Sequence, residues 1–203
     1  MKNLLIVLGI IAGLALLCGI ITIPLYNQPA VLDAAVEKEL ADVQTAYQRR
    51  ADLIPNLVAT VKASSSFEEG VLTAVTEARS KATSIKLTSE DLSNPETMAK
   101  FQAAQAALSS SLGRLIATAE AYPELKSTEA YRDLMVQLEG SESRVATETI
   151  DANKAVQAYN TCVTTFPCSF AAGMRGYIKR SQFSAVEGSE VSPRVDFSEV
   201  QAQ

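Results

Sequence analysis

The chain has 203 residues, enough for one domain with its own core and hardly enough for two. Its formal net charge of −5 argues against a nucleic-acid partner, because phosphate binding needs clustered lysine and arginine. The sequence contains no histidine, the commonest general base and metal ligand, and its three cysteines are too few for a disulfide scaffold.

The first predicted element is the uncharged run LLIVLGIIAGLALLCGIITI, from Leu4 to Ile23. At about 1.5 Å per residue this run matches a hydrocarbon layer of roughly 30 Å. A cleaved signal peptide has a shorter apolar run and a small-residue cleavage site, and the large Leu17 before Cys18 disfavours a lipoprotein signal. After a short segment 1–3, we therefore expect residues 4–23 to form an uncleaved transmembrane helix in the lipid bilayer.

Charges on the two sides of this run predict its orientation. Lys2 is the only charged residue before Asp33, and the next charge after Asp33 is Glu37. Because positive charge tends to stay in the cytoplasm, we expect a cytoplasmic N-terminus and an exported C-terminal domain. The expected location is the cell membrane, crossed once.

Helical periodicity dominates residues 30–183, and strand-like alternation does not persist. We expect helices over about 36–61 and 67–85, a third that begins near Pro95, a fourth from an N-cap at Ser127 to near Pro167, and a short helix over 170–179. The sequence thus predicts an all-α fold, in which a transmembrane helix precedes an elongated antiparallel four-helix bundle (30–183) and a loose tail (184–203). The positions expected to face the core are Val36, Leu40, Val43, Tyr47, Arg50, Ile54, Leu57, Val61, Val71, Val75, Ala78, Ala82, Phe101, Leu108, Leu112, Leu115, Ala119, Tyr131, Leu138, Val145, Ala152 and Tyr159.

The segment RRADLIPNLV, residues 49–58, places a charge on that apolar face. Arg50 falls on the stripe, whereas Arg49 lies beside it, towards solvent. An arginine inside a bundle needs a carboxylate partner, and Glu77 is the first candidate, with alternatives Glu142 and Glu148 on the last helix. The pair has two interpretations, a register-fixing ion pair and a charge relay, and we favour the first.

Further along the same segment, Pro55 removes a backbone hydrogen bond and should bend the helix. Either Asn56 or a neighbouring helix is expected to bond the carbonyl that Pro55 leaves free.

Six stretches between Tyr26 and Phe197 carry a family resemblance: RRADLIPNLVATVK, VLTAVTEARSKA, AEAYPELKSTEAYRDLMVQLEGSESRVA, NKAVQAYN, FPCSFAAGMRGYIKRSQF and PRVDF. In these stretches the chain resembles the LemA family. It implies a membrane-anchored bacterial protein with an elongated helical bundle and no established catalytic activity.

The chain departs from the family pattern at three places. The family usually has tryptophan near Leu40, a His-Glu pair where this chain has Phe67 and Glu68, and an arginine-rich end to the last helix where this chain reads TETIDAN. If those family residues form a polar site, we expect this chain to lack it.

The remaining candidates are structural or interaction residues, and we expect no catalytic, cofactor-binding or metal-binding residue. Cys162 and Cys168 flank Pro167, and a disulfide and two free thiols both stay open as interpretations. The full set of candidates is Arg49, Arg50, Asp52, Pro55, Asn56, Glu77, Tyr159 and Asn160, with Cys162 and Cys168 as the possible disulfide.

Taken together, the apolar run and the amphipathic helices favour a non-enzymatic envelope scaffold. Such a protein would act through self-association, as a homo-oligomer, or by docking another envelope protein. The alternative is a lipid- or peptide-binding module that uses a groove between helices.

Overall fold

The computed structural model describes residues 2–63 and 68–184; the side chains of residues 2, 4, 5, 15, 18 and 21 are outside this description. In this part of the chain all regular structure is helical, which confirms the all-α prediction. The elements are α1 (Lys2–Lys62), α2 (Glu69–Ser84), the 3-10 helix η1 (Asp91–Ser93), α3 (Pro95–Ala119), α4 (Pro123–Ser127), α5 (Glu129–Thr164) and α6 (Cys168–Met174).

Helix α1 is continuous over 61 residues, although Pro24, Pro29 and Pro55 lie inside it. The expected boundary between an apolar helix ending at residue 23 and a bundle starting at residue 30 is therefore not a break in the helix. Within the described residues, no helix is both long enough and apolar enough to cross a membrane. The transmembrane helix expected at residues 4–23 stays a prediction.

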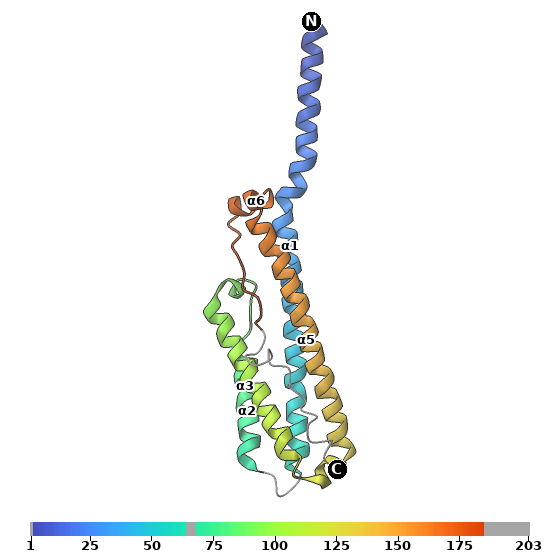
Figure 1. Ribbon diagram of the computed structural model, residues 1–203, viewed down its shortest axis with the longest axis vertical. Helices are drawn as coiled ribbons and strands as arrows, with labels where there is room; N and C mark the ends of the chain where they lie inside the picture. Colours follow the sequence, from blue (N-terminus) through green and yellow to red (C-terminus); the bar gives the residue numbers. More distant parts are fainter. Residues whose placement is uncertain (1, 64–67, 185–203) are drawn as a thin grey trace, which may run out of the picture.

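The bundle consists of two antiparallel helix pairs (Figure 1). The long helices α1 and α5 pack along each other, and the shorter α2 and α3 cover the part of that pair farther from the N-terminus. Helix α5 has 36 residues, which corresponds to about 54 Å at the α-helical rise. The N-terminal part of α1 projects beyond the bundle, at the end where α6 lies.

Apolar side chains form two cores, one above the other along the bundle. The core farther from the N-terminus is centred on Ile54, Leu57, Val75, Leu112 and Leu115. A second core, nearer to α6, has other members: Val36, Leu40, Val43, Leu87, Leu92, Met98, Phe101, Ala152, Val156, Tyr159 and Phe183. Every position that the periodicity assigned to the core is buried except Tyr47, which is half-buried.

Local capping signals explain where the helices begin. The Asn94 side chain accepts hydrogen bonds from the backbone N–H groups of Glu96 and Thr97, and Pro95 takes the first helical position of α3, as expected. The predicted cap at Ser127 is wrong by one residue. Ser127 ends α4, and Thr128 caps α5 by accepting from the N–H of Tyr131.

The last predicted helix, 170–179, is also displaced. Helix α6 covers Cys168–Met174 and stops before Gly176, whose φ of 73° lies in the left-handed region that favours glycine. Residues 177–184 form no helix and run back along the bundle (Figure 1). We call residues 178–184 the strap. The expected loose tail lies, after Ser184, outside the described residues.

Candidate functional site

A layer of polar side chains separates the two apolar cores, and Arg50 is its centre. The Arg50 side chain is only 2 % exposed. Its Nη1 donates to Ser109 Oγ at 3.0 Å and to the Glu142 carboxylate at 3.0 and 3.2 Å. Its Nη2 donates to Gln105 Oε1 at 2.6 Å. One guanidinium therefore holds α1, α3 and α5 together at a single level of the bundle.

Further hydrogen bonds extend this layer to α2. Gln105, which is buried, donates from Nε2 to the Ala82 carbonyl of α2 at 3.3 Å. The Arg50 guanidinium also lies over the Tyr47 ring, 5.2 Å from its centroid. Burial raises the pKa of Tyr47, although the nearby Arg50 charge acts in the opposite direction. A buried charge with this many partners fits a register-fixing role.

The partner first expected for Arg50 is wrong. Glu77 is exposed on α2, next to the buried Ala78, so its carboxylate points away from the core. Arg50 pairs instead with Glu142, one of the two alternatives on the last helix. The other, Glu148, lies 3.9 Å from Arg144 on its own helix.

Pro55 leaves a carbonyl without its helical donor, and a neighbouring helix supplies one. The carbonyl four residues before Pro55 belongs to Ala51, and Arg79 Nε of α2 donates to it at 2.7 Å. Of the two donors expected, Asn56 and a neighbouring helix, the neighbouring helix is the one observed. Asn56 is exposed and makes no described contact with this carbonyl. The proline thus creates an acceptor that ties α2 to α1.

The other charged residues of the opening segment lie at the surface. Arg49 is exposed, as expected. Asp52 is also exposed; it accepts from Gln48 Nε2 at 2.7 Å and lies 3.9 Å from Arg79. Ion pairs as exposed as this one contribute little to stability.

The strap is held on α5 by asparagine side chains. Asn160 donates to the Arg180 carbonyl at 2.8 Å and accepts from the Arg180 N–H at 2.9 Å. Asn153 makes the same pair of bonds with Phe183, at 2.9 and 2.8 Å. Each asparagine amide therefore bonds both the N–H and the C=O of one extended residue, as a neighbouring β-strand would.

The spacing of these two asparagines matches the spacing of the strap. Seven residues of helix rise about 10.5 Å, and three residues of extended chain cover about 10 Å. Before the first asparagine contact, Tyr159 Oη donates to the Ile178 carbonyl at 3.0 Å. Between the two contacts, the Ser181 N–H donates to the Leu92 carbonyl at 2.6 Å. The strap thus joins α5 to η1.

An ion pair joins the N-terminal part of the strap to α1. Arg180 Nη1 lies 2.5 Å from Asp33 Oδ1, and the guanidinium lies 4.7 Å from the centroid of the Tyr159 ring. Both charged side chains are largely buried. Burial raises the pKa of Asp33 above its ordinary value, and the Arg180 charge offsets part of that increase.

Cys162 and Cys168 are bonded in the structure, with their Cα atoms 5.1 Å apart. The bond joins the end of α5 to the start of α6, and both residues are buried. It links the two helices whose junction includes Pro167.

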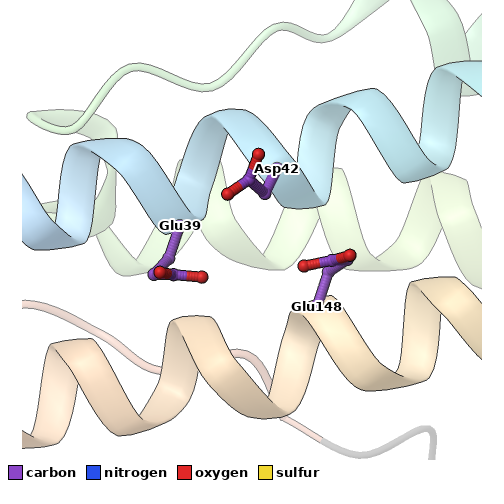
Figure 2. A group of neighbouring side chains, drawn as sticks. All are labelled: Glu39, Asp42 and Glu148. Atoms are coloured by element: carbon purple, nitrogen blue, oxygen red, sulfur yellow. The ribbon is translucent and has the colours of Figure 1, made fainter.

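Three carboxylates from α1 and α5 form the group of described residues that comes nearest to a metal site (Figure 2). The ligand oxygens of Glu39, Asp42 and Glu148 all lie within 4.8 Å of one another. Oxygen ligands of this kind suit calcium or magnesium. The expectation that the chain binds no metal stays a prediction.

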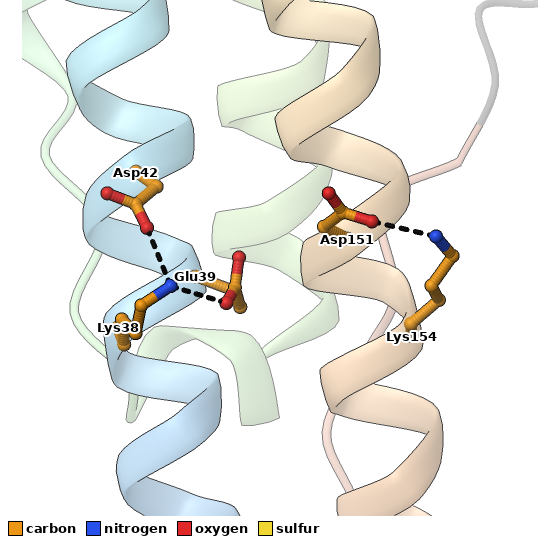
Figure 3. Close-up of polar contacts among 5 residues, drawn as sticks. All are labelled: Lys38, Glu39, Asp42, Asp151 and Lys154. Carbon is orange, nitrogen blue, oxygen red and sulfur yellow. Dashed lines mark hydrogen bonds and ion pairs between the residues drawn. The ribbon is translucent and has the colours of Figure 1, made fainter.

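A lysine already neutralises part of this carboxylate group. Figure 3 shows Lys38 Nζ between Glu39 at 2.7 Å and Asp42 at 3.1 Å. These hydrogen bonds raise the pKa of Lys38, so the ammonium stays charged. On the facing helix, Asp151 pairs with Lys154 at 2.8 Å (Figure 3). The face of the bundle formed here by α1 and α5 therefore carries exposed ion pairs.

Two open grooves flank α1 near the arginine layer. One, of about 430 Å³, is lined by residues of α1, α3, α5 and the strap, among them Arg50, Glu142 and Phe183. The other, of about 560 Å³, lies where α1 faces α2 and α3, beside Gln48 and Phe101. Ser109 borders the first groove, but its hydroxyl accepts from Arg50, which does not activate it as a nucleophile.

Several residues of these networks were not identified from the sequence. They are Asp33, Arg79, Gln105, Ser109, Asn153 and Arg180. One signal was available for the strap. Asn153 and Asn160 each follow a buried heptad position and lie seven residues apart, so they share one edge of α5. The other partners come from distant elements, and only the fold brings them together.

Comparison with known proteins identifies relatives for most of the chain. Residues 39–197 match the LemA family. The magnetosome proteins MamQ 1 and MamQ 2 of Paramagnetospirillum magneticum are each 25% identical over 174 residues, which is 78% of this chain and 64% of theirs. The magnetosome protein MamQ of Magnetospirillum gryphiswaldense is 33% identical over 72 residues, 36% of this chain and 26% of that protein.

The chain spans less than two thirds of the length of these relatives. The family match, residues 39–197, includes the whole arginine layer, the α5 asparagines and the strap. It agrees with the resemblance seen in the sequence motifs. The chain belongs to the LemA family.

Proposed function

We propose that this protein is a non-enzymatic, single-pass scaffold of the cell membrane whose helical bundle docks another envelope protein or a second copy. The observation that carries the proposal is the state of the N-terminal part of α1. Its large apolar side chains are each more than half exposed: Ile6, Val7, Leu8, Ile10, Ile11, Leu14, Leu16, Leu17, Ile20 and Ile23. A run of this length without any charge needs an apolar environment, and a bilayer supplies one.

The continuity of α1 supports a mechanical role for the anchor. The same helix that carries the apolar run continues into the bundle as the stripe from Val36 to Val61. A bundle attached in this way is held at a set distance from the bilayer. The proposed orientation has residues 1–3 in the cytoplasm and the bundle on the exported side, in agreement with Lys2 before the run and Asp33 after it.

The chemistry of the bundle supports a role without catalysis. Arg50, the most deeply buried charge among the described residues, makes its described hydrogen bonds to helices of the bundle. The chain has no histidine to act as a general base for Ser109. The names of the MamQ relatives give a location, the magnetosome, and no reaction.

Removal of the apolar run tests the proposal. A variant that begins at Asn27 should fractionate as a soluble, helical protein, whereas the full chain should remain in membranes washed at high pH. Recovery of the shortened variant in washed membranes would contradict an anchor at residues 4–23. Cross-linking of the tagged full chain in cells then identifies what the bundle docks, and absence of any cross-linked species would argue against a scaffold.

Extended-peptide binding is a second candidate function, and the strap supports it. The bundle already holds one extended segment, largely through hydrogen bonds to its main chain. Recognition of this kind is insensitive to sequence, so another segment could replace the strap. A labelled peptide with the sequence of residues 177–184 should then bind the full chain, and should bind an Asn153→Ala variant more weakly. Equal binding to both would exclude this function for the α5 asparagines.

A further inference from the structure

Helix α6 carries large apolar side chains that the bundle does not cover. Phe170 and Met174 lie four residues apart on one side of α6 and are 71 % and 68 % exposed. Phe166 just before the helix and Ile178 just after it are 87 % and 61 % exposed. We call residues 165–180 the α6 cap. Such a group of apolar side chains marks an interaction surface.

The cap differs from the rest of the chain in charge. Residues 165–184 contain Arg175, Lys179 and Arg180 and no acidic residue, although the whole chain has a net charge of −5. Arg180 is taken up by its ion pair with Asp33, whereas Arg175 and Lys179 are exposed. Apolar side chains beside exposed cations are complementary to an anionic lipid surface.

The position of the cap follows from its contacts with α1. Arg175 Nη1 donates to the Tyr26 carbonyl at 3.4 Å, and the guanidinium lies 5.4 Å from the centroid of the Tyr26 ring. Tyr26 is three residues beyond Ile23, or about 4.5 Å along the helix axis. Since the headgroup layer is about 5 to 7 Å thick on each side, the cap lies at its depth if Leu4–Ile23 spans the bilayer.

Figure 1 agrees with this placement, because α6 lies at the end of the bundle from which the N-terminal part of α1 projects. Two tyrosines, Tyr26 and Tyr177, lie against Arg175 in the same region. Tyrosine is enriched at membrane interfaces, where its ring is in apolar surroundings and its hydroxyl is hydrated.

We propose that the α6 cap is a second membrane contact, which inserts Phe166, Phe170 and Met174 into the interface of an anionic bilayer while Arg175 and Lys179 bind lipid phosphates. This inference rests on the anchor proposed above. The continuous α1 sets the distance of the bundle from the bilayer, but a single spanning helix can still tilt relative to the plane of the bilayer. Two contacts on different elements fix the long axis of the bundle relative to the membrane.

The absence of tryptophan from the sequence provides a clean test in the full chain. Three single-tryptophan variants, Phe170→Trp, Leu14→Trp and Val136→Trp, are reconstituted into vesicles of phosphatidylcholine and phosphatidylglycerol. All three positions are more than half exposed, and Val136 is on the bundle, far from α6 in the chain. Lipids brominated at shallow or deep acyl positions then quench the tryptophan according to its depth.

We expect Phe170→Trp to emit at shorter wavelength than Val136→Trp and to lose emission with shallow-brominated lipid, while Val136→Trp is unaffected. Emission of Phe170→Trp that matches Val136→Trp would overturn the cap. Leu14→Trp reports on the anchor separately, through quenching by deep-brominated lipid. A quenched Leu14→Trp beside an unquenched Phe170→Trp would refute the cap and keep the anchor. The reverse pattern would refute the anchor, and with it the depth at which the anchor places the cap.

The charge component has its own measurement. Replacing phosphatidylglycerol by phosphatidylcholine, or introducing Lys179→Gln, should reduce the shallow quenching of Phe170→Trp. The matched control is Lys126→Gln, an exposed lysine on α4. Quenching that is independent of both lipid charge and Lys179 would contradict phosphate binding by the cap.

Discussion

Truncation of Arg50 should destabilise the bundle far more than truncation of its neighbour. Arg50→Ala leaves the buried Gln105 Oε1 without its 2.6 Å donor and creates a cavity between the two cores. Breaking a buried ion pair costs about 3 to 5 kcal/mol. We expect about 3 kcal/mol, near the low end of that range, because Glu142 is 43 % exposed and water can solvate it once it is unpaired.

Urea denaturation of the full chain in mild detergent, followed by circular dichroism, measures this difference. With a slope of about 2 kcal/mol per molar urea, the midpoint for Arg50→Ala should fall by about 1.5 M. Glu142→Gln retains an acceptor in a partly exposed pair and should cost about 1 kcal/mol. Arg49→Ala, at the exposed neighbouring position, should change stability by less than about 0.5 kcal/mol. Equal midpoints for Arg50→Ala and Arg49→Ala would refute the arginine layer as a stabilising element.

Three further predictions concern the strap, its ion pair and the disulfide. Asn160→Ala should speed tryptic cleavage after Lys179 and Arg180, because it removes two hydrogen bonds from the strap. The control Gln157→Ala, at an exposed position of the same helix, should not change the cleavage rate. Equal cleavage rates for the two variants would show that the Asn160 amide does not hold the strap. The pKa of Asp33 is higher in the folded chain than in the unfolded chain, so between these two pKa values the folded chain binds more protons. Wild-type stability therefore falls as the pH rises from the unfolded to the folded pKa of Asp33. Asp33→Asn lacks this slope, so its stability relative to the wild type should increase between acidic and neutral pH, and a constant difference in urea midpoints would contradict the raised pKa. Alkylation in denaturant without reductant should modify one of the three cysteines, and all three after reduction; three modified at once would show that the bond is absent in the isolated protein.

Periodicity predicted the core well because bundle packing is set by local rules. Buried side chains recur on one face of each helix, so Tyr131, Leu138, Val145, Ala152 and Tyr159 could be assigned from their seven-residue spacing alone. The same rule placed Arg50 inside the bundle. It could not choose between Glu77 and Glu142, because that choice depends on how far each facing helix is rotated.

The boundaries of the elements were harder to predict. Pro24 and Pro29 are strong local breakers, yet α1 continues through both. After α6 the error was the opposite, because a helix was predicted as far as residue 179 where the chain is extended. Gly176 adopts a left-handed conformation, and the asparagines of α5 bond the backbone that follows it. The strap is extended because side chains from another helix satisfy its main chain, and no local pattern encodes that.

The anchor of the bundle can be tested most directly by adding charge to the apolar run of the otherwise intact protein. The variant Ile11→Lys with Leu14→Lys adds two charges near the middle of residues 4–23, each costing about 2.5 to 3.5 kcal/mol at the centre of a membrane helix. The control, Val136→Lys with Ile150→Lys, adds the same charge at equally exposed apolar positions of α5. After a high-pH wash, the control should remain in the membrane fraction and the first variant should be lost from it. Retention of both variants to the same extent would contradict a membrane-anchored bundle.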